Sequence, residues 1–180
     1  MTLVHVAKHF TPIFDFFEVT SQIITLTGSS CKRKDKLVQL QLEQILKEVE
    51  SGERLTGRGI NQETSLRRAA KTRWGTHYES ILRIISMYNA VLKLPRIIEV
   101  DGITLDSRKK AESLAYTMDT FDFVFKLHMM RKVLGITNTL SKALQKKDQD
   151  IVNAMDNVNL CKVSFKTLRE SGWDDLLLEV

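Results

Sequence analysis

Apolar residues recur along this chain at the three- and four-residue spacing of amphipathic helices. Val38, Leu42, Ile45 and Val49 follow one another at i, i+4, i+7 and i+11, which places them on one face of a helix. Glycine and proline together number only 10 residues, 8 and 2 respectively, about half of what average usage gives. Strict apolar-polar alternation, which indicates strands, is nearly absent. The pattern predicts an all-α bundle of about five to seven helices, forming a single domain over residues 1–180.

Turn residues divide the first half of the chain into helices. Pro12 interrupts the helical stretch 2–27, and Gly28 is a plausible stop for it. Ser29 or Ser30 is a candidate N-cap for the next helix, which ends at residues 51–52. These signals predict two helical segments before residue 53.

The second half of the chain is expected to be helical with three interruptions. Helical periodicity resumes at Ile81 and runs to Pro95, which kinks or ends the helix. Asp101–Gly102 is a firm turn signal, and Gly135 is a candidate break. The run FDFVFKLHMM is apolar on most faces and is expected to be the buried centre of the bundle. Other apolar positions assigned to these helical faces are Ile84, Ile85, Tyr88, Leu92, Leu114, Met118, Phe121, Phe125, Leu140, Leu144, Ile151, Met155 and Val158.

Residues 53–73 form a long polar connection without a sustained period, and loops of this length are usually functional or disordered. Between Arg54 and Arg73 six basic side chains stand against Glu63 alone. This surplus of +5 equals the formal net charge of the whole protein. Such a concentration suits contact with phosphates, because each neutralised phosphate releases condensed counterions. Five of the six are arginines, which favours forked, directional hydrogen bonds. A solvated loop without a ligand is the alternative.

Trp74 follows this segment directly and precedes an apolar helical run. An aromatic side chain beside basic groups is what stacking on an unpaired base requires. Equally, Trp74 could anchor the start of its helix by packing into the bundle. The chemistry of the residues leaves both interpretations open.

Other constellations predict no cofactor, metal site or catalytic set. His5 and His9 have a spacing that can share a zinc ion, but no third ligand lies nearby. His128 lies in an apolar stretch and is expected to be a hydrogen-bonded core residue or a half-buried one. Asp174 and Asp175 crowd the C-terminal end with Glu179, where paired-metal chemistry would need a rigid scaffold.

The remaining features concern compartment and partners. Cys31 and Cys161 lie far apart in no metal-ligand spacing, which predicts two reduced thiols in an intracellular protein. The sequence contains no run of 18 apolar residues, so no membrane-spanning helix is predicted. The first ten residues lack the features of a secretory signal. We expect neither a membrane nor a small-molecule substrate as partner.

The block KTRWGTHYESI, with the preceding GRGINQETSLRR and TGSSCKRKDKL, resembles the hAT superfamily of DNA transposases. It is most similar to the plant branch described as zinc finger MYM-type-like, or TTF-type zinc finger proteins with a hAT dimerisation domain. The resemblance runs through nearly the whole chain and is most specific around Arg73–Trp74. It implies an all-helical domain inserted into a ribonuclease-H-like core.

The resemblance also implies roles for individual residues. An Arg/Lys-Trp pair of the family helps to hold the DNA end during hairpin formation, and it corresponds here to Arg73 and Trp74. Trp74 would stabilise a flipped or unpaired base, and Arg73 the adjacent phosphates. The two aspartates and the glutamate that bind divalent metal in the family, its Cys-x-x-His element, its zinc finger and its dimerisation region have no counterpart in this chain.

The resulting hypothesis is a catalytically inert, fragment-like relative of hAT transposases that retains a weak DNA-end-binding surface and acts in the nucleus. A helical protein-interaction module with no DNA role is the alternative. Self-association is also expected, through exposed apolar surface near Phe14, Phe17 and residues 176–178. The candidate DNA-binding residues are Arg58, Arg67, Arg68, Lys71, Arg73 and Trp74.

Overall fold

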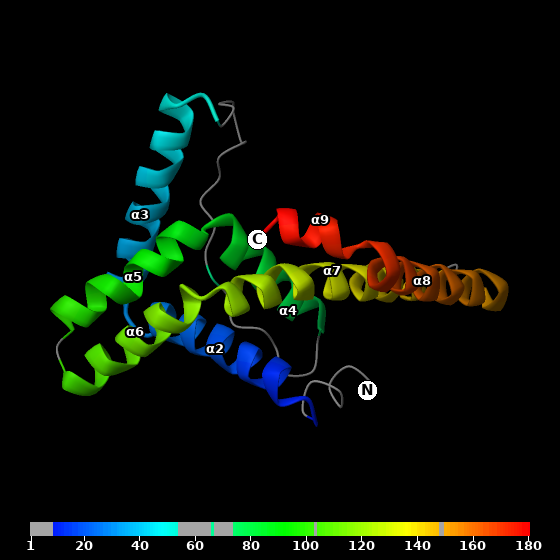
Figure 1. Cartoon of the computed structure of the whole chain (residues 1–180), viewed down its shortest axis with the longest axis horizontal. Helices are drawn as coiled ribbons and strands as arrows, with labels where there is room; N and C mark the ends of the chain where they lie inside the picture. Colours follow the sequence, from blue (N-terminus) through cyan, green and yellow to red (C-terminus); the bar gives the residue numbers. More distant parts are fainter. Residues whose placement is uncertain (1–8, 54–65, 67–73, 103, 148–149) are drawn as a thin grey trace.

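The computed structural model describes residues 9–53, 66, 74–102, 104–147 and 150–180. Within these ranges the chain forms eight α-helices and no strand (Figure 1). The all-α prediction is confirmed, with one helix more than the expected range. The helices are α2 (Thr11–Gly28), α3 (Cys31–Glu50), α4 (Trp74–Ser86), α5 (Tyr88–Asp101), α6 (Leu105–Met118), α7 (Phe121–Leu144), α8 (Ile151–Ser171) and α9 (Trp173–Leu178).

The boundaries of α2 and α3 follow the turn residues. Pro12 stands in the first turn of α2, where its missing N–H is harmless because first-turn amides have no acceptor within the helix. Ser30 is the N-cap residue of α3, with extended backbone, although its side chain accepts no capping hydrogen bond. Gly52 follows α3 with φ 78°, a left-handed conformation that glycine adopts without strain. The boundaries predicted at Pro12, Ser30 and residues 51–52 are therefore confirmed.

The buried face predicted for α3 is confirmed only at Ile45, which is 8% exposed. Leu42 is 49% exposed, and Val38 and Val49 are only half-buried. The helix packs against both α2 and α5, so its buried surface is set by two neighbours rather than by one apolar stripe. The buried residues of α3 are Leu37, Leu40, Gln41 and Ile45.

The predicted helix around Ile81 is in fact two helices, and the break does not fall at the proline. Met87 separates α4 from α5 with φ −128° and ψ 28°, and its side chain is fully buried. Pro95 lies inside α5, which continues to Asp101. The expectation that Pro95 ends the helix is therefore wrong. Its ring is fully buried, and this apolar burial offsets the backbone hydrogen bond that proline cannot donate.

Hydroxyl and carboxylate caps start the later helices. The side chain of Thr104 accepts a hydrogen bond from the N–H of Ser107 at 3.2 Å, and Thr120 accepts one from Phe123 at 3.2 Å. Asp150 accepts one from Asn153 at 2.7 Å. Each bond satisfies an amide that has no acceptor within its helix.

Two expectations for the region of α6 and α7 are corrected. The apolar stripe of Leu114 and Met118, both buried, does not continue through Phe121, which is 65% exposed. The cap at Thr120 starts a new helix and so changes the direction of the chain. Gly135 does not break α7, which runs on to Leu144.

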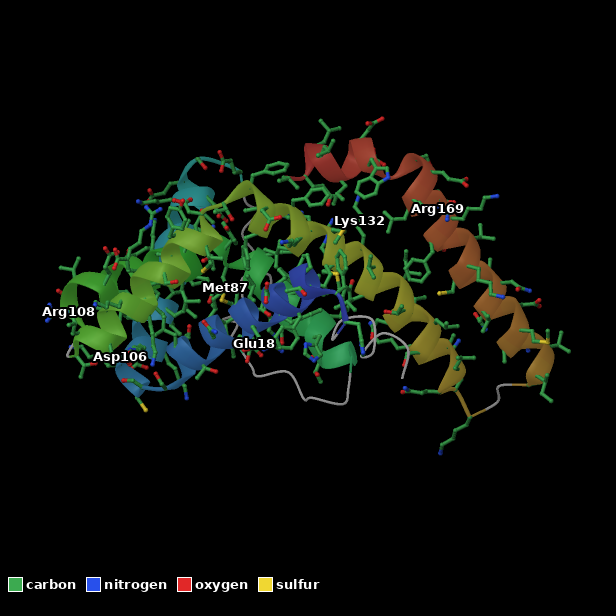
Figure 2. All side chains as sticks on the ribbon, turned by 60° about the horizontal axis from the view of Figure 1, so that its bottom comes forward. Glu18, Met87, Asp106, Arg108, Lys132 and Arg169 are labelled. Carbon is green, nitrogen blue, oxygen red and sulfur yellow. The ribbon has the colours of Figure 1, made fainter. Side chains whose placement is uncertain are left out.

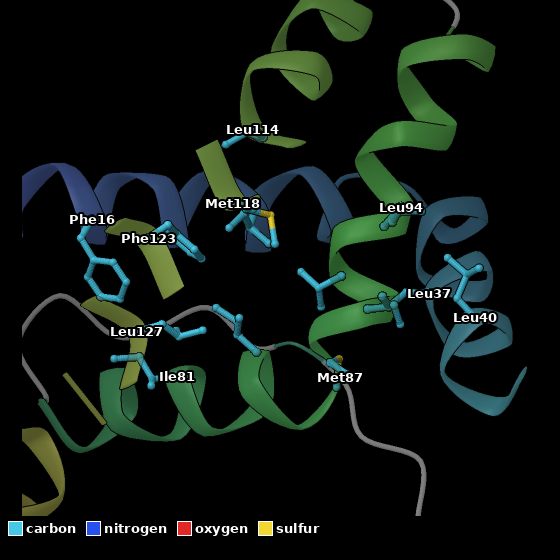
Figure 3. Packing of buried hydrophobic residues seen from close by; sticks show 14 of the residues in the cluster. Phe16, Leu37, Leu40, Ile81, Met87, Leu94, Leu114, Met118, Phe123 and Leu127 are labelled. Carbon is cyan, nitrogen blue, oxygen red and sulfur yellow. The ribbon is translucent and has the colours of Figure 1, made fainter. Parts of the chain in front are cut away.

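The hydrophobic core is formed by residues from all the helices from α2 through α7 (Figure 3). α7 packs against α2, α4, α6, α8 and α9, in agreement with its expected central place. Its buried residues form one stripe rather than covering most faces, because α8 and α9 bury their side of α7 only in part. This cluster of buried residues comprises Phe16, Ile23, Leu37, Leu40, Ile81, Ile84, Met87, Ala90, Val91, Leu94, Ile98, Ala111, Leu114, Met118, Phe123, Leu127, Met130 and Leu134.

The C-terminal helices stand apart from this core. α8 has no buried residue over its 21 positions, and it packs against α7 and α9 only along one side. Ile151 is 80% exposed and Met155 63%, so their expected core positions are wrong. In α9 only Leu176 is buried. Figure 1 shows α8 and the end of α7 running together away from the other helices.

Tyr88 provides a pH-dependent contact between α5 and α6. Its hydroxyl donates a hydrogen bond to the carbonyl of Met118, and burial, with the nearby charge of Asp119, raises its pKa to about 12 from the ordinary 10.0. Because the folded pKa is the higher one, this contribution is fully present below pH 10.0 and is lost as the pH rises toward 12. Tyr88→Phe is expected to lower the free energy of unfolding by about 0.5–1.5 kcal/mol at pH 8.

The measurement is urea denaturation of both proteins at several pH values. The stability difference between wild type and Tyr88→Phe should shrink above pH 10.0. Tyr116→Phe is the control, since Tyr116 is 78% exposed. An equal loss in both variants would contradict the role of Tyr88.

Candidate nucleic-acid interface

The sequence-predicted DNA-binding residues fall at the edge of the described structure. Arg58, Arg67, Arg68, Lys71 and Arg73 lie outside the described residues. Trp74 is the first residue of α4, and its side chain also lies outside the description. The structure thus places the helix that follows the basic segment, and the two interpretations of the tryptophan stay open.

The first turns of α4 are seated on α7. A Cβ at Gly75 would lie 3.2 Å from the side-chain oxygen of Asn138, tighter than ordinary van der Waals contact. Next along the helix, the ring of Tyr78 covers Gly135, where a Cβ would come within 3.4 Å of it. Gly75 therefore lets α4 approach α7 closely, whereas a Cβ at Gly135 would make ordinary contact with Tyr78. The start of α4 is fixed against α7 by this packing.

The N-terminal part of α4 also contacts α2. The rings of His77 and Phe17 meet edge to face, with centroids 5.2 Å apart. Burial lowers the pKa of His77 below its ordinary 6.5, because a charged imidazole is poorly solvated there. His77 is therefore neutral at physiological pH and adds no charge to the interface.

Leu66 attaches the basic segment to the core between its two ends. This residue is partly buried and packs against the core cluster. Arg67 and Arg68 follow it directly in the sequence, and consecutive Cα atoms are only about 3.8 Å apart. Leu66 is therefore a point of contact with the core that comes directly before the arginine pair in the sequence.

Other predicted site features are placed as follows. Among the described residues no group of three or more His, Cys, Asp or Glu side chains could hold a metal ion; His5 lies outside that range. Cys31 is exposed and Cys161 half-buried, both as free thiols. His128 is half-buried on α7, as expected, with its Nδ1 atom 3.4 Å from Oε2 of Glu179.

A groove of about 830 Å³ lies between α4, α7 and α8. Leu82, Ile136, Leu140, Leu160 and Leu168 supply much of its apolar lining. At one end it reaches two basic residues of α7 and the junction between α8 and α9. The groove lies where α8 packs on α7 along one side.

Sequence reasoning missed a second basic cluster, formed by His128, Arg131 and Lys132 on α7. Their i, i+3 and i+4 spacing puts them on one helix face, and this signal was available in the sequence. Their common partner, Glu179, lies 48 positions beyond Arg131, and no local pattern reveals that pairing.

Comparison with known proteins gives no relative: no family model, curated protein or solved structure matches the chain. No helix within the described ranges has both the length and the apolar character needed to cross a bilayer. The resemblance to hAT transposases stays a hypothesis that rests on the sequence blocks around Trp74.

Proposed function

We propose that this chain is a non-catalytic helical domain that binds DNA ends, similar to the insertion domain of hAT-type transposases. The observation that carries the proposal is that Leu66 and Trp74, which flank most of the basic residues, both belong to the folded structure. Leu66 packs against the core, and Trp74 begins a helix seated on α7. Because consecutive Cα atoms are only about 3.8 Å apart, the basic residues between these two positions stay within reach of the folded helices.

The proposal assigns two separable contributions to binding. Arg67 and Arg68, with Arg58, Lys71 and Arg73, contact phosphates in a sequence-independent and salt-sensitive way. Trp74 stacks on an unpaired base, an interaction that depends little on salt. Catalytic carboxylates of the family belong to a neighbouring core in this proposal, and action in the nucleus follows from the same resemblance.

The arginine contribution is tested by a salt series. Arg67→Ala combined with Arg68→Ala is expected to lower the log-log salt slope of binding by about 1.8 on duplex DNA, since each lost phosphate contact removes about 0.9. The salt slope is measured by fluorescence anisotropy with blunt duplex, hairpin and single-stranded DNA ends. Lys109→Ala with Lys110→Ala removes the same charge from exposed positions of α6 and should leave the slope nearly unchanged.

The tryptophan contribution is tested on the same DNA ends. Trp74→Ala is expected to weaken binding by about 1–3 kcal/mol on hairpin or single-stranded ends and little on blunt duplex. Circular dichroism checks the fold, because a buried tryptophan would instead cost about 3–5 kcal/mol of stability on truncation. If Trp74→Ala unfolds the domain and the wild type binds no DNA at low salt, the packing interpretation holds and the proposal is wrong.

One observation favours the second candidate, a helical protein-interaction module. α8 exposes Ile151, Val152, Leu160 and Val163 at 60% or more. The expected apolar patches are present only in part: Phe14 is 44% exposed and Leu178 87%, whereas Leu176 is buried. Such surface suits protein contacts, self-association among them. Salt-insensitive DNA binding, or none, in the experiments above would favour this candidate.

A further inference from the structure

Three basic side chains of α7 converge on one carboxylate at the C-terminal end of the chain. The guanidinium of Arg131 donates a hydrogen bond to Oε2 of Glu179 at 2.6 Å. His128 approaches the same oxygen at 3.4 Å, and the Nζ atom of Lys132 lies 3.4 Å from Oε1. Figure 2 labels Lys132 on α7, beside α9. The arrangement is that of an anion-binding site whose ligand comes from the same chain.

Glu179 alone does not neutralise the two cations that contact it, and Asp175 of α9 lines the same groove as Arg131 and Lys132. Arg131 and Lys132 are permanent cations at neutral pH, whereas Glu179 supplies one negative charge. α7 as a whole bears four lysines and arginines against Asp122 alone. Burial opposes ionisation of Glu179, but the hydrogen bond from His128 and the charges of Arg131 and Lys132 hold the pKa of this carboxyl below its ordinary 4.5.

The helix that supplies Glu179 is weakly attached. α9 is only 6 residues long and has one buried side chain, Leu176. Trp173 stacks on Phe125 with centroids 6.2 Å apart, yet 46% of it stays exposed. Such a short helix depends on these contacts for its structure, so α9 is able to leave α7 without disturbing the core cluster.

We propose that His128, Arg131 and Lys132 form a second phosphate-binding site for the nucleic-acid backbone, which α9 occupies in cis through Glu179. The inference rests on the proposed DNA-binding function and adds its regulation. Displacing Glu179 frees two permanent cations, and the guanidinium fork of Arg131 matches a phosphate as well as a carboxylate. α9 therefore acts as an autoinhibitory cover that keeps these two cations from contacting DNA while Glu179 is bound to them.

The geometry favours phosphate over an acidic peptide as the incoming ligand. An acidic side chain contacts these cations only if the backbone that carries it is held nearby. For Glu179 the buried side chain of Leu176 holds α9 in place. A phosphodiester exposes its oxygens along an accessible backbone, so it needs no apolar anchor. The excess of positive charge on α7 also suits a polyanion, which binds through counterion release.

Glu179→Gln tests the proposal because it removes the charge while keeping the size of the side chain. Two additional phosphate contacts would raise the salt slope on duplex DNA by about 1.8, which means that affinity falls about tenfold more than in the wild type between roughly 50 and 200 mM salt. Glu170→Gln is the matched control. It changes the net charge equally, but Glu170 is exposed on α8 and pairs with Arg169 at 3.5 Å.

The outcomes separate this inference from the proposed function. Adding Arg131→Gln and Lys132→Gln to Glu179→Gln should abolish the gain, with circular dichroism confirming the fold. If the basic segment makes no DNA contact, Arg67→Ala with Arg68→Ala has no effect in any background, whereas the gain from Glu179→Gln persists. Equal slopes for Glu179→Gln and Glu170→Gln overturn the inference. So does a gain for polyglutamate without one for duplex DNA.

Discussion

Ile84→Ala is expected to lower the free energy of unfolding by about 2–5 kcal/mol. Ile84 is 0% exposed and lies in the core cluster that joins α2 to α7. Truncation removes apolar contacts and leaves a cavity that neighbouring side chains, fixed on several helices, fill only in part. Urea denaturation followed by circular dichroism measures the loss through the transition midpoint.

The control is a leucine of similar size on the surface. Leu46 is 60% exposed on α3, and Leu46→Ala should change stability by no more than about 0.5 kcal/mol. Equal losses in the two variants would mean that the core does not lie between α4 and its neighbours.

Gly102→Ala is expected to destabilise the domain by about 1–3 kcal/mol, the usual cost of overpacking. A Cβ at Gly102 would lie 2.5 Å from the carbonyl oxygen of Ile98 and 2.9 Å from Cγ of Arg108. The first of these is a backbone atom that already accepts the N–H of Gly102 at 2.8 Å. Relief therefore requires a shift of the whole connection between α5 and α6. Thermal and urea unfolding measure the effect.

Gly28→Ala is the matched control for this substitution. Nothing lies within 4 Å of a Cβ at Gly28, and the residue closes α2 in a helical conformation. Alanine there should stabilise the domain by about 0.4–1 kcal/mol, because it restricts the unfolded chain. If both glycines tolerate alanine equally, steric exclusion does not explain Gly102.

The positions of helix ends were predictable where one residue decides them. Pro12 and Asp101–Gly102 mark real boundaries because proline and glycine act locally, and Ser30 marks one through its extended backbone, without a side-chain cap. The reason for Gly102 was not predictable: its φ of −62° is ordinary, and only the packing of Arg108 and Ile98 excludes a side chain. Pro95 was misjudged because burial of its ring, a tertiary effect, outweighs a local penalty.

The candidate site residues also divide into those that local sequence reveals and those that depend on tertiary packing. The charge of the basic segment and its junction with Trp74 are visible in the sequence, because they depend on neighbouring residues. The pairing of Glu179 with Arg131 depends on α9 folding back along α7. Likewise, whether α8 contributes to the core depends on which helices surround it, and its apolar residues alone suggested burial that does not occur.

The absence of any buried residue in α8 has a thermodynamic consequence for the whole molecule. The heat-capacity change on unfolding arises mainly from apolar surface that becomes hydrated. α8 has 21 residues, none of them buried, so it exposes little additional apolar surface when the protein unfolds. The heat-capacity change therefore comes mainly from the helices from α2 to α7. Normalised by chain length, it should therefore fall below the roughly 12–15 cal/mol/K per residue of ordinary globular domains. The curve of stability against temperature would be correspondingly broad and flat.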